Sequence, residues 1–169
     1  MDIKQIIAQM SANAERIGGL VTGVSAEQAR WKPDPDSWSI LEVINHLYDE
    51  EQFDFHVRLN IILHTPGEAW PPIDPQGWVT ERKYNERELG TSLQGYLDER
   101  RSSLAWLESL DAPDWEARVP TPWGSISAGD MFVAWATHDL LAMRQLVELQ
   151  YAWIVRLSEP YNGEYAGEW

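Results

Sequence analysis

Residues 39–50 read SILEVINHLYDE, and this stretch begins the helix on which our prediction of the fold rests. Ser39 and Glu42 have the spacing of a capping box. In such a box the hydroxyl accepts a hydrogen bond from a free amide of the first turn, and the carboxylate accepts one from the capping residue. Apolar residues then recur every three or four positions from Ile40 to about Leu63. That period is typical of a helix with one buried face, so we predict one long helix here.

Three other stretches have the same helical period and cover residues 3–17, 84–110 and 128–157. The last of them is apolar almost all round, which predicts a helix that lies deep in the structure. Segments rich in Pro and Trp separate the stretches. Residues 64–78 contain too much Pro to be predicted as anything but a loop, and residues 111–126 predict another loop with a short extended arm. We therefore predict an all-α protein, a four-helix bundle with long Pro/Trp-rich loops, formed by residues 1–169 as one domain.

The composition limits the possible functions. The chain has 27 acidic and 13 basic side chains among 169 residues, a formal net charge of −14. Phosphate backbones and anionic lipids attract clustered Lys and Arg, so we expect binding to neither nucleic acid nor a membrane. The absence of Cys excludes disulfides, thiolate metal ligands and a cysteine nucleophile. We see no secretory signal and no uncharged run of about 18 residues, and therefore expect a cytoplasmic protein.

Two histidines occupy positions where a bundle needs apolar side chains. In the second stretch, helical steps place His46 and Glu50 on the apolar stripe, one turn apart. In the fourth stretch, His138 and Gln145 also lie on the apolar stripe, two turns apart. If the two helices are neighbours, an imidazole from each enters the same part of the interior. A buried polar group without a partner costs about 1–3 kcal/mol, so these groups either form a structural hydrogen-bond network or hold a divalent metal.

The remaining patterns indicate less. His56 lies on a different face from His46 and has charged neighbours, while His64 ends its helix, so we expect both at the surface. The chain contains no Gly-rich phosphate loop, no Gly-x-Ser-x-Gly elbow and no His-Glu-x-x-His motif. The two inward-facing histidines are therefore the strongest candidates for a site.

The same segments resemble the DinB/YfiT-like superfamily of four-helix-bundle proteins. The resemblance rests on Trp31-x-Pro33, Trp38-Ser39-Ile40, Glu42-Val43-Ile44-x-His46-Leu47, and His138-Asp139-Leu140 with Gln145. The order of the elements, the long loop after the second helix and the chain length agree as well. The resemblance therefore covers most of the chain.

This resemblance implies a metal site. Members of the superfamily typically bind a divalent metal, zinc or nickel for instance, through three histidines, one from the second helix and two, four residues apart, from the fourth. His46 and His138 match the first two positions, but the third is Ala142, whose methyl group cannot bind a metal. Three outcomes stay open. Glu50 could supply the third ligand, a metal could bind weakly through two histidines and water, or the imidazoles could only hydrogen-bond one another in a vestigial site.

The first function we expect is that of a metal-dependent enzyme with a small-molecule substrate. Relatives that use low-molecular-weight thiols imply thiol-dependent S-transferase chemistry on a small electrophile. Glu50 would then be the third ligand or a general base. Asp139 or Gln145 would orient the ligands. Trp135 or Trp78 would form a wall of the pocket.

The alternative is a non-catalytic bundle with a degenerate metal site, acting as a small-molecule-binding or dimerisation module. Ala142 favours it, as do the aromatic loops and an irregular tail over residues 159–169. Apolar surface rich in Trp is typical of interface cores, so we also expect a homodimer formed through helix faces.

Overall fold

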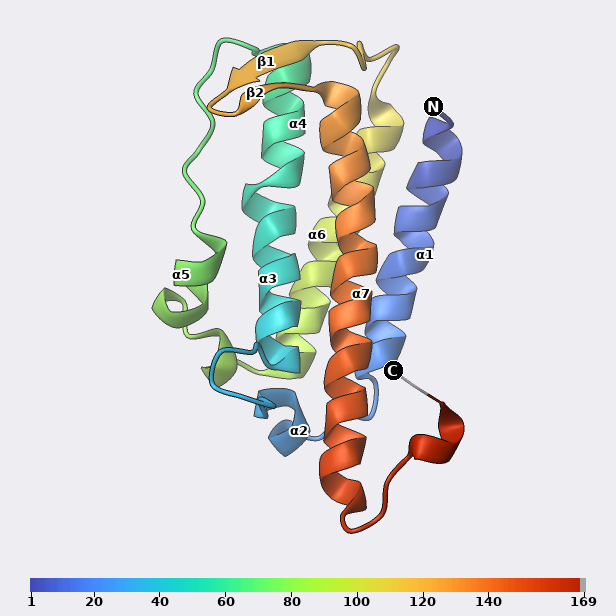
Figure 1. The fold of residues 1–169 in the computed structure, drawn as a ribbon. Helices are drawn as coiled ribbons and strands as arrows, with labels where there is room; N and C mark the ends of the chain where they lie inside the picture. Colours follow the sequence, from blue (N-terminus) through green and yellow to red (C-terminus); the bar gives the residue numbers. More distant parts are fainter. Residues whose placement is uncertain (168–169) are drawn as a thin grey trace.

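Four helical rods lie side by side in the computed structural model, which describes residues 1–167 (Figure 1). The rods are α1 (Ile3–Val21), α3 continued by α4 (Ile40–Phe53 and Phe55–His64), α6 (Leu89–Ser109) and α7 (Ala128–Ser158). Shorter elements connect them: α2 (Ala26–Arg30), α5 (Pro75–Glu81), the 3-10 turns η1 (Tyr84–Glu86) and η2 (Glu164–Ala166), and the strands β1 (Arg118–Thr121) and β2 (Gly124–Ser127). The predicted all-α four-helix bundle is confirmed. The predicted extended arm is the antiparallel β1–β2 hairpin, in which Val119 lies opposite Ile126.

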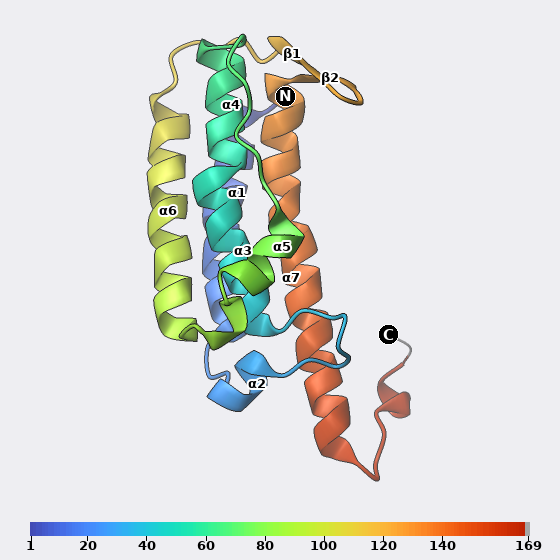
Figure 2. The same cartoon turned by 90° about the vertical axis from the view of Figure 1, so that its left-hand side faces the viewer.

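The rods pack in a closed order around one interior. α3 packs against α6, α6 against α1, and α1 against α7, and α7 returns to α4 and α3. One apolar cluster, which includes Leu59 and Phe132, fills the end that carries the hairpin. A second cluster, which includes Ile44 and Leu146, fills the opposite end. α5 and η1 lie across the outer side of α3 (Figure 2).

Capping boxes fix the starts of the two helices that carry the candidate histidines. The amide of Glu42 donates to the Ser39 hydroxyl (3.1 Å) and the amide of Ser39 donates to the Glu42 carboxylate (2.8 Å). The same exchange between Ser127 and Asp130 begins α7. Both boxes satisfy amides that the first helical turn leaves free, so the local sequence alone sets where these helices begin.

The second and third helical stretches differ in detail from the prediction. The helix expected to run unbroken from Ile40 to Leu63 is interrupted at Asp54, whose backbone leaves the helical region and whose carboxylate pairs with Arg58 Nε at 2.6 Å. The third rod begins at Leu89 rather than near Tyr84, which instead lies in η1. Periodicity could not reveal either change, because the apolar spacing continues through both breaks.

The Pro-rich segment 64–78 is also more ordered than predicted. Pro75 begins α5, and the Asp74 side chain accepts a hydrogen bond from the amide of Gly77. Proline is well tolerated at the first helical position, where its missing amide hydrogen is not needed. Arg82 and Tyr84 then both donate to the buried Asp49 carboxylate on α3. This contact holds the connection against the bundle.

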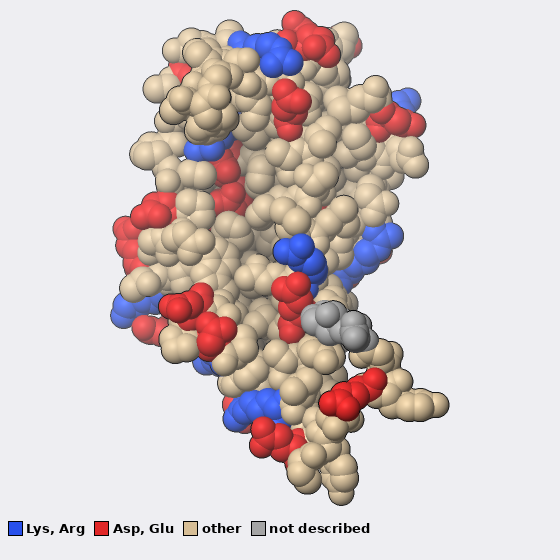
Figure 3. Space-filling view, in the orientation of Figure 1, with Lys and Arg blue, Asp and Glu red and all other residues tan. Residues whose placement is uncertain are grey.

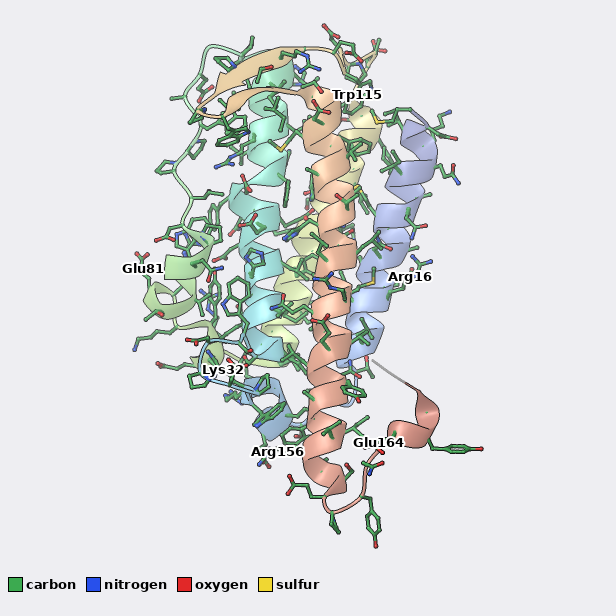
Figure 4. All side chains as sticks on the ribbon, viewed as in Figure 1. Arg16, Lys32, Glu81, Trp115, Arg156 and Glu164 are labelled. Carbon is green, nitrogen blue, oxygen red and sulfur yellow. The ribbon has the colours of Figure 1, made fainter. Side chains whose placement is uncertain are left out.

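At its far end α7 extends past the other rods, and α2 packs on this extension. Trp31 contacts Trp153 edge to face, with ring centroids 5.4 Å apart. The guanidinium of Arg156, labelled in Figure 4, lies over both rings and 3.5 Å from the Glu27 carboxylate. The irregular tail predicted over residues 159–169 contains the turn η2, and its last two residues lie outside the described part of the chain.

The last helix, predicted to lie deep in the structure, is buried on one face only. One face of α7 packs into the bundle, but its outer face exposes a series of apolar side chains that includes Leu140, Leu141, Ile154 and Leu157. The all-round apolar pattern therefore reflects two different surfaces rather than a central position. Within residues 1–167, no helix combines the length and apolar character needed to cross a membrane.

A buried ionic cluster lies between the two apolar ends and joins all four rods. Arg100 of α6 donates two hydrogen bonds to Glu51 of α3 (2.8 and 2.9 Å) and two to Asp139 of α7 (both 2.8 Å). Trp135 also donates to Glu51 (2.9 Å), and Asn13 of α1 donates to Asp139 (3.3 Å). Removing one partner from such a buried cluster leaves uncompensated charge, which is strongly destabilising.

We expect the Arg100→Met substitution to lower the free energy of unfolding by about 3–5 kcal/mol, because it leaves two buried carboxylates without a cation. Urea unfolding followed by circular dichroism measures this change. The neighbouring Arg101, which is 73% exposed, provides the control. Arg101→Met should change the free energy of unfolding by no more than about 0.5 kcal/mol. Equal effects of the two substitutions would contradict a central role for the cluster.

Candidate functional site

The two candidate histidines face one another between α3 and α7. Nε2 of His46 lies 3.3 Å from Nε2 of His138, and the rings are inclined at 70° with centroids 5.2 Å apart. The structure thus brings together the two imidazoles that the apolar stripes placed in the interior. Their role as metal ligands stays a prediction.

Aromatic rings enclose the histidine pair. The Trp38 ring meets His46 edge to face at 4.9 Å, and Phe55 lies 5.2 Å from His138. Phe55 also stacks in parallel on Trp135, so the wall continues into the core. Only about an eighth of the His46 side chain is exposed (12%). The pair therefore lies in an apolar, poorly hydrated niche with a small opening.

This niche keeps both imidazoles neutral at physiological pH. Burial lowers the pKa of His46 to about 3, and the nearby His138 lowers it further in the same direction. Burial also lowers the pKa of His138, although the Asp139 charge opposes this shift. A neutral imidazole has one nitrogen lone pair free to accept a hydrogen bond or to bind a metal. Both remain possible for the facing Nε2 atoms.

Glu50 lies beside the other nitrogen of His46. Its Oε1 is 3.8 Å from His46 Nδ1, and both atoms are buried without a hydrogen-bond partner in the described part of the chain. Burial, followed by the neighbouring Asp54, raises the pKa of Glu50 to about 8, so the carboxyl carries a proton near neutral pH. Glu50 thus neighbours the outer nitrogen of the ring, rather than the one that faces His138.

A complete three-ligand set is not present among residues 1–167. No group of three His, Asp or Glu side chains there is arranged to hold a metal ion. Ala142, at the third position implied by the family resemblance, is buried in the apolar cluster around Leu146 and Leu149. The open alternative in which Glu50 supplies a third ligand stays a prediction; in this structure its Oε1 lies beside Nδ1 of His46 rather than beside the facing Nε2 atoms.

The predicted supporting residues lie in different places. Asp139 does not orient either histidine, because its oxygens accept from Arg100 and Asn13 in the buried ionic cluster. Trp78 lies away from the pair, against Phe53 and beneath Arg82. Helical spacing could not show this, since it gives the direction of a side chain but not which of two neighbouring helices it meets.

A cavity of about 620 Å³ lies next to the niche. Trp38 lines this cavity while contacting His46, and Gln145 lines it two turns after His138 on α7. Side chains from the segment before α3, from α5 and from α7 complete its lining: Pro33, Asp36, Ser37, Gln76, Glu148, Leu149, Tyr151 and Ala152. Such a volume suits a small molecule. Neither histidine is among the lining residues, so the cavity neighbours the pair only through Trp38, which contacts His46.

The sequence analysis did not identify the aromatic wall residues, nor the Asp54–Arg58 ion pair that lies next to Glu50. Trp38 and Phe55 are ordinary aromatics in the sequence, and only the packing of α4 and the segment before α3 brings them to the histidines. Asp54 and Arg58 were detectable, because opposite charges four residues apart on a helix commonly pair.

The other two histidines lie outside the site. His64 is exposed at the end of α4, as expected. His56 was expected at the surface but is half-buried, with its ring 4.4 Å from Trp106 and stacked on Trp135. Its charged sequence neighbours point elsewhere, which made the surface prediction wrong.

Comparison with known proteins places the fold in a family. The model of the DinB superfamily matches residues 9–146, which is most of the chain. The chain belongs to the DinB superfamily. Among solved structures, the bundle is similar to YfiT from Bacillus subtilis, with a TM-score of 0.78, 16% sequence identity, and coverage of 88% of this chain and 86% of YfiT. YfiT is described as a probable metal-dependent hydrolase with an unusual four-helix bundle topology. No curated protein matches this chain.

The burial of His46 predicts a specific loss of stability in acid. Its folded-state pKa of about 3 lies below the ordinary 6.5, so the unfolded chain binds the proton more readily between these values. Stability contributed by the neutral ring is therefore present above about pH 6.5 and lost as the pH falls toward 3. Between about pH 6.5 and 4.5, we expect the free energy of unfolding to fall by about 2 kcal/mol less in His46→Gln than in the unsubstituted protein.

Urea unfolding of both proteins across this pH range measures the effect. The exposed His64 supplies the control, since His64→Gln removes an imidazole that lies outside the niche. A His46→Gln profile parallel to that of the unsubstituted protein would contradict the buried neutral state of His46.

Proposed function

We propose that this DinB-superfamily protein is a divalent-metal-dependent enzyme whose metal is held by His46 and His138. The observation that carries the proposal is the 3.3 Å separation of the two Nε2 atoms. Two nitrogens that each bind zinc at about 2.0–2.1 Å in a tetrahedral site lie about 3.3 Å apart. The pair thus has the spacing of two adjacent ligands of one metal.

The donor chemistry of the pair also fits a metal such as zinc or nickel. Both rings are kept neutral by burial, which is the state in which imidazole binds metals. Among residues 1–167, His46 Nδ1 has no hydrogen-bond partner, and it lies 3.8 Å from Glu50 Oε1. A histidine that binds a metal commonly donates a hydrogen bond from its second ring nitrogen to a carboxylate, which fixes the orientation of the ring. The description of YfiT as a probable metal-dependent hydrolase supports the same class of chemistry.

Two protein ligands leave more of the coordination sphere open than the three of ordinary catalytic zinc sites. We therefore propose a weak site in which water or the substrate itself supplies the remaining ligands. When bound, the metal would supply Lewis-acid chemistry, polarising an oxygen or sulfur atom of the substrate. Because the chain has no Cys, a thiol in such a reaction would come with the substrate. Thiol-dependent S-transfer, which the resemblance implied, is the finer form of the proposal.

The chain's own residues would bind the substrate and handle protons. The 620 Å³ cavity beside Trp38 would hold a small-molecule substrate. Trp38 and Phe55 would keep water from the histidines, which strengthens electrostatic interactions there. Glu50, with its pKa raised to about 8, would give up or take a proton beside His46 near neutral pH.

Metal binding tests the proposal directly. We expect protein purified without an affinity tag to bind one zinc or nickel ion, and His46→Ala to lose this binding by at least about 100-fold in affinity. Isothermal titration calorimetry and elemental analysis measure both quantities. His64→Ala is the matched control, because it removes an exposed imidazole at the end of α4. If zinc and nickel neither bind nor change the melting temperature of the unsubstituted protein, the proposal fails.

Ala142 favours a second candidate, a non-catalytic bundle in which the two imidazoles only hydrogen-bond and the cavity binds a small molecule. The absence of a third ligand in the described residues supports this reading. It predicts full ligand binding in the cavity without any metal. The metal titration therefore separates the two candidates.

Restoring the third histidine gives an independent check. Ala142 lies one turn after His138, so Ala142→His should add an imidazole to the pair and tighten zinc binding by about 100-fold or more. Ala142→Gln, which adds similar bulk without an imidazole, controls for repacking. An Ala142→His protein that folds normally without a gain in affinity would show that this position does not face the pair.

A further inference from the structure

The side chain of Asp54, where the second rod is interrupted, supports Glu50 rather than the start of α4. Asp54 directly precedes α4, a position where an Asp side chain ordinarily accepts a hydrogen bond from a free amide of the first turn. It makes no such bond to any amide among the residues that the structure describes. Its carboxylate instead lies 2.6 Å from Arg58 Nε and is hydrogen-bonded to the Glu50 carboxyl. The capping position is therefore used to hold a second carboxyl group.

Arg58 and the loop after α4 keep this carboxylate in place. The guanidinium of Arg58 lies 4.6 Å from the centroid of the Trp70 ring in that loop, and only 15% of the Arg58 side chain is exposed. Acidic and basic side chains lie next to one another in the hollow between the loop and α4 (Figure 3). The aromatic ring and the carboxylate together hold the guanidinium in one position. These contacts form a row of side chains that leads to the histidine pair, which we call the Asp54 chain: Trp70, Arg58, Asp54 and Glu50.

The Asp54 chain ends at a carboxyl group that can only accept a further hydrogen bond. A hydrogen bond between two carboxyl groups uses one proton, and in this chain that proton lies between Glu50 and Asp54. Glu50 then has no other hydrogen to donate, whichever of the two groups carries the shared one. Any hydrogen bond between Glu50 and His46 must therefore be donated by the imidazole.

His46 Nδ1 is the atom in position to donate it. Nδ1 lies 3.8 Å from Glu50 Oε1, both atoms are buried, and neither has another hydrogen-bond partner within residues 1–167. Leaving them unpaired would cost about 1–3 kcal/mol for each atom. A movement of the Glu50 carboxyl by about 1 Å brings the two atoms to hydrogen-bond distance. In a neutral imidazole, a proton on Nδ1 leaves the lone pair on Nε2.

We infer that Asp54, held by Arg58, is a positioning residue that keeps Glu50 against His46 and so fixes the proton of His46 on Nδ1. The lone pair of His46 Nε2 then faces His138, whose Nε2 lies 3.3 Å away. In the metal-free protein, His138 therefore donates its Nε2 hydrogen to His46. The same tautomer of His46 is the one that binds a metal through Nε2, and in this respect the inference rests on the proposed function.

Long-range proton–nitrogen correlation NMR of the isotope-labelled full chain tests the inference after a chelator has removed any metal. In a neutral imidazole one ring nitrogen carries the proton and the other carries the lone pair, and the two give distinct nitrogen shifts. We expect the proton of His46 on Nδ1 and the proton of His138 on Nε2. The chain has four histidines, so the spectra of His46→Gln and His138→Gln assign these signals.

Two substitutions separate positioning from a merely structural role. Asp54→Ala removes the group that holds Glu50, and we expect His46 to change from a single tautomer to a mixture of both. Glu50→Gln should keep the Nδ1 tautomer, because an amide donates to Asp54 through its nitrogen and accepts from His46 through its oxygen. Asp49→Asn is the matched control, since it breaks a buried ion pair of α3, with Arg82 at 2.7 Å, that does not include Glu50. This control should leave the tautomer unchanged.

A proton on Nε2 of His46 in the unsubstituted protein would overturn the inference, even if Asp54→Ala does not fold. An Asp54→Ala protein that folds and keeps the single Nδ1 tautomer would overturn the positioning role of Asp54. Because the spectra are recorded without metal, this test is separate from that of the proposed function. A protein that shows the expected tautomers but binds neither zinc nor nickel would contradict the proposed function and support the inference.

Discussion

The rest of the structure depends on the hydrogen bonds that the buried Arg100 guanidinium donates to two carboxylates. It binds Glu51 of α3 and Asp139 of α7 with two hydrogen bonds each, and so fixes the relative height of these two helices. A purely apolar interface would tolerate small shifts along the helix axes, whereas four short charged hydrogen bonds to a planar group do not. The ionic cluster therefore specifies one arrangement of the helices, and this matters more to the fold than the net free energy that the cluster contributes.

The histidine pair is positioned by this same contact. His138 directly precedes Asp139, so the two side chains point in directions about 100° apart on α7. When Asp139 turns toward Arg100, His138 turns toward α3, where His46 lies one and a half turns before Glu51. The register that Arg100 stabilises between α3 and α7 is thus the one in which the imidazoles approach to 3.3 Å. Two adjacent polar residues of α7, His138 and Asp139, thus face different neighbouring helices.

The site combines features that favour a metal with one that opposes it. Neutral, facing imidazoles in an aromatic niche are what a metal centre in a bundle requires, but the position that the family resemblance assigns to the third ligand holds a methyl group. Losing one ligand weakens a site and also opens it, because the vacated position becomes available to a substrate atom. Burial of this region also raises the pKa of Glu50, because a carboxylate there would be too poorly hydrated to ionise fully at neutral pH.

The sequence by itself determined the helices, their caps and the inward direction of His46 and His138, because all of these follow from local spacing and local hydrogen bonds. It could not place the break at Asp54 or the helix at Pro75, since apolar period and Pro content do not report backbone geometry residue by residue. It misjudged Asp139 and the outer face of α7 for a shared reason. The period of a helix tells which residues share a face, but not what that face meets. Only the tertiary structure decided that Asp139 meets a buried arginine, that the two imidazoles meet one another, and that one apolar face of α7 remains exposed.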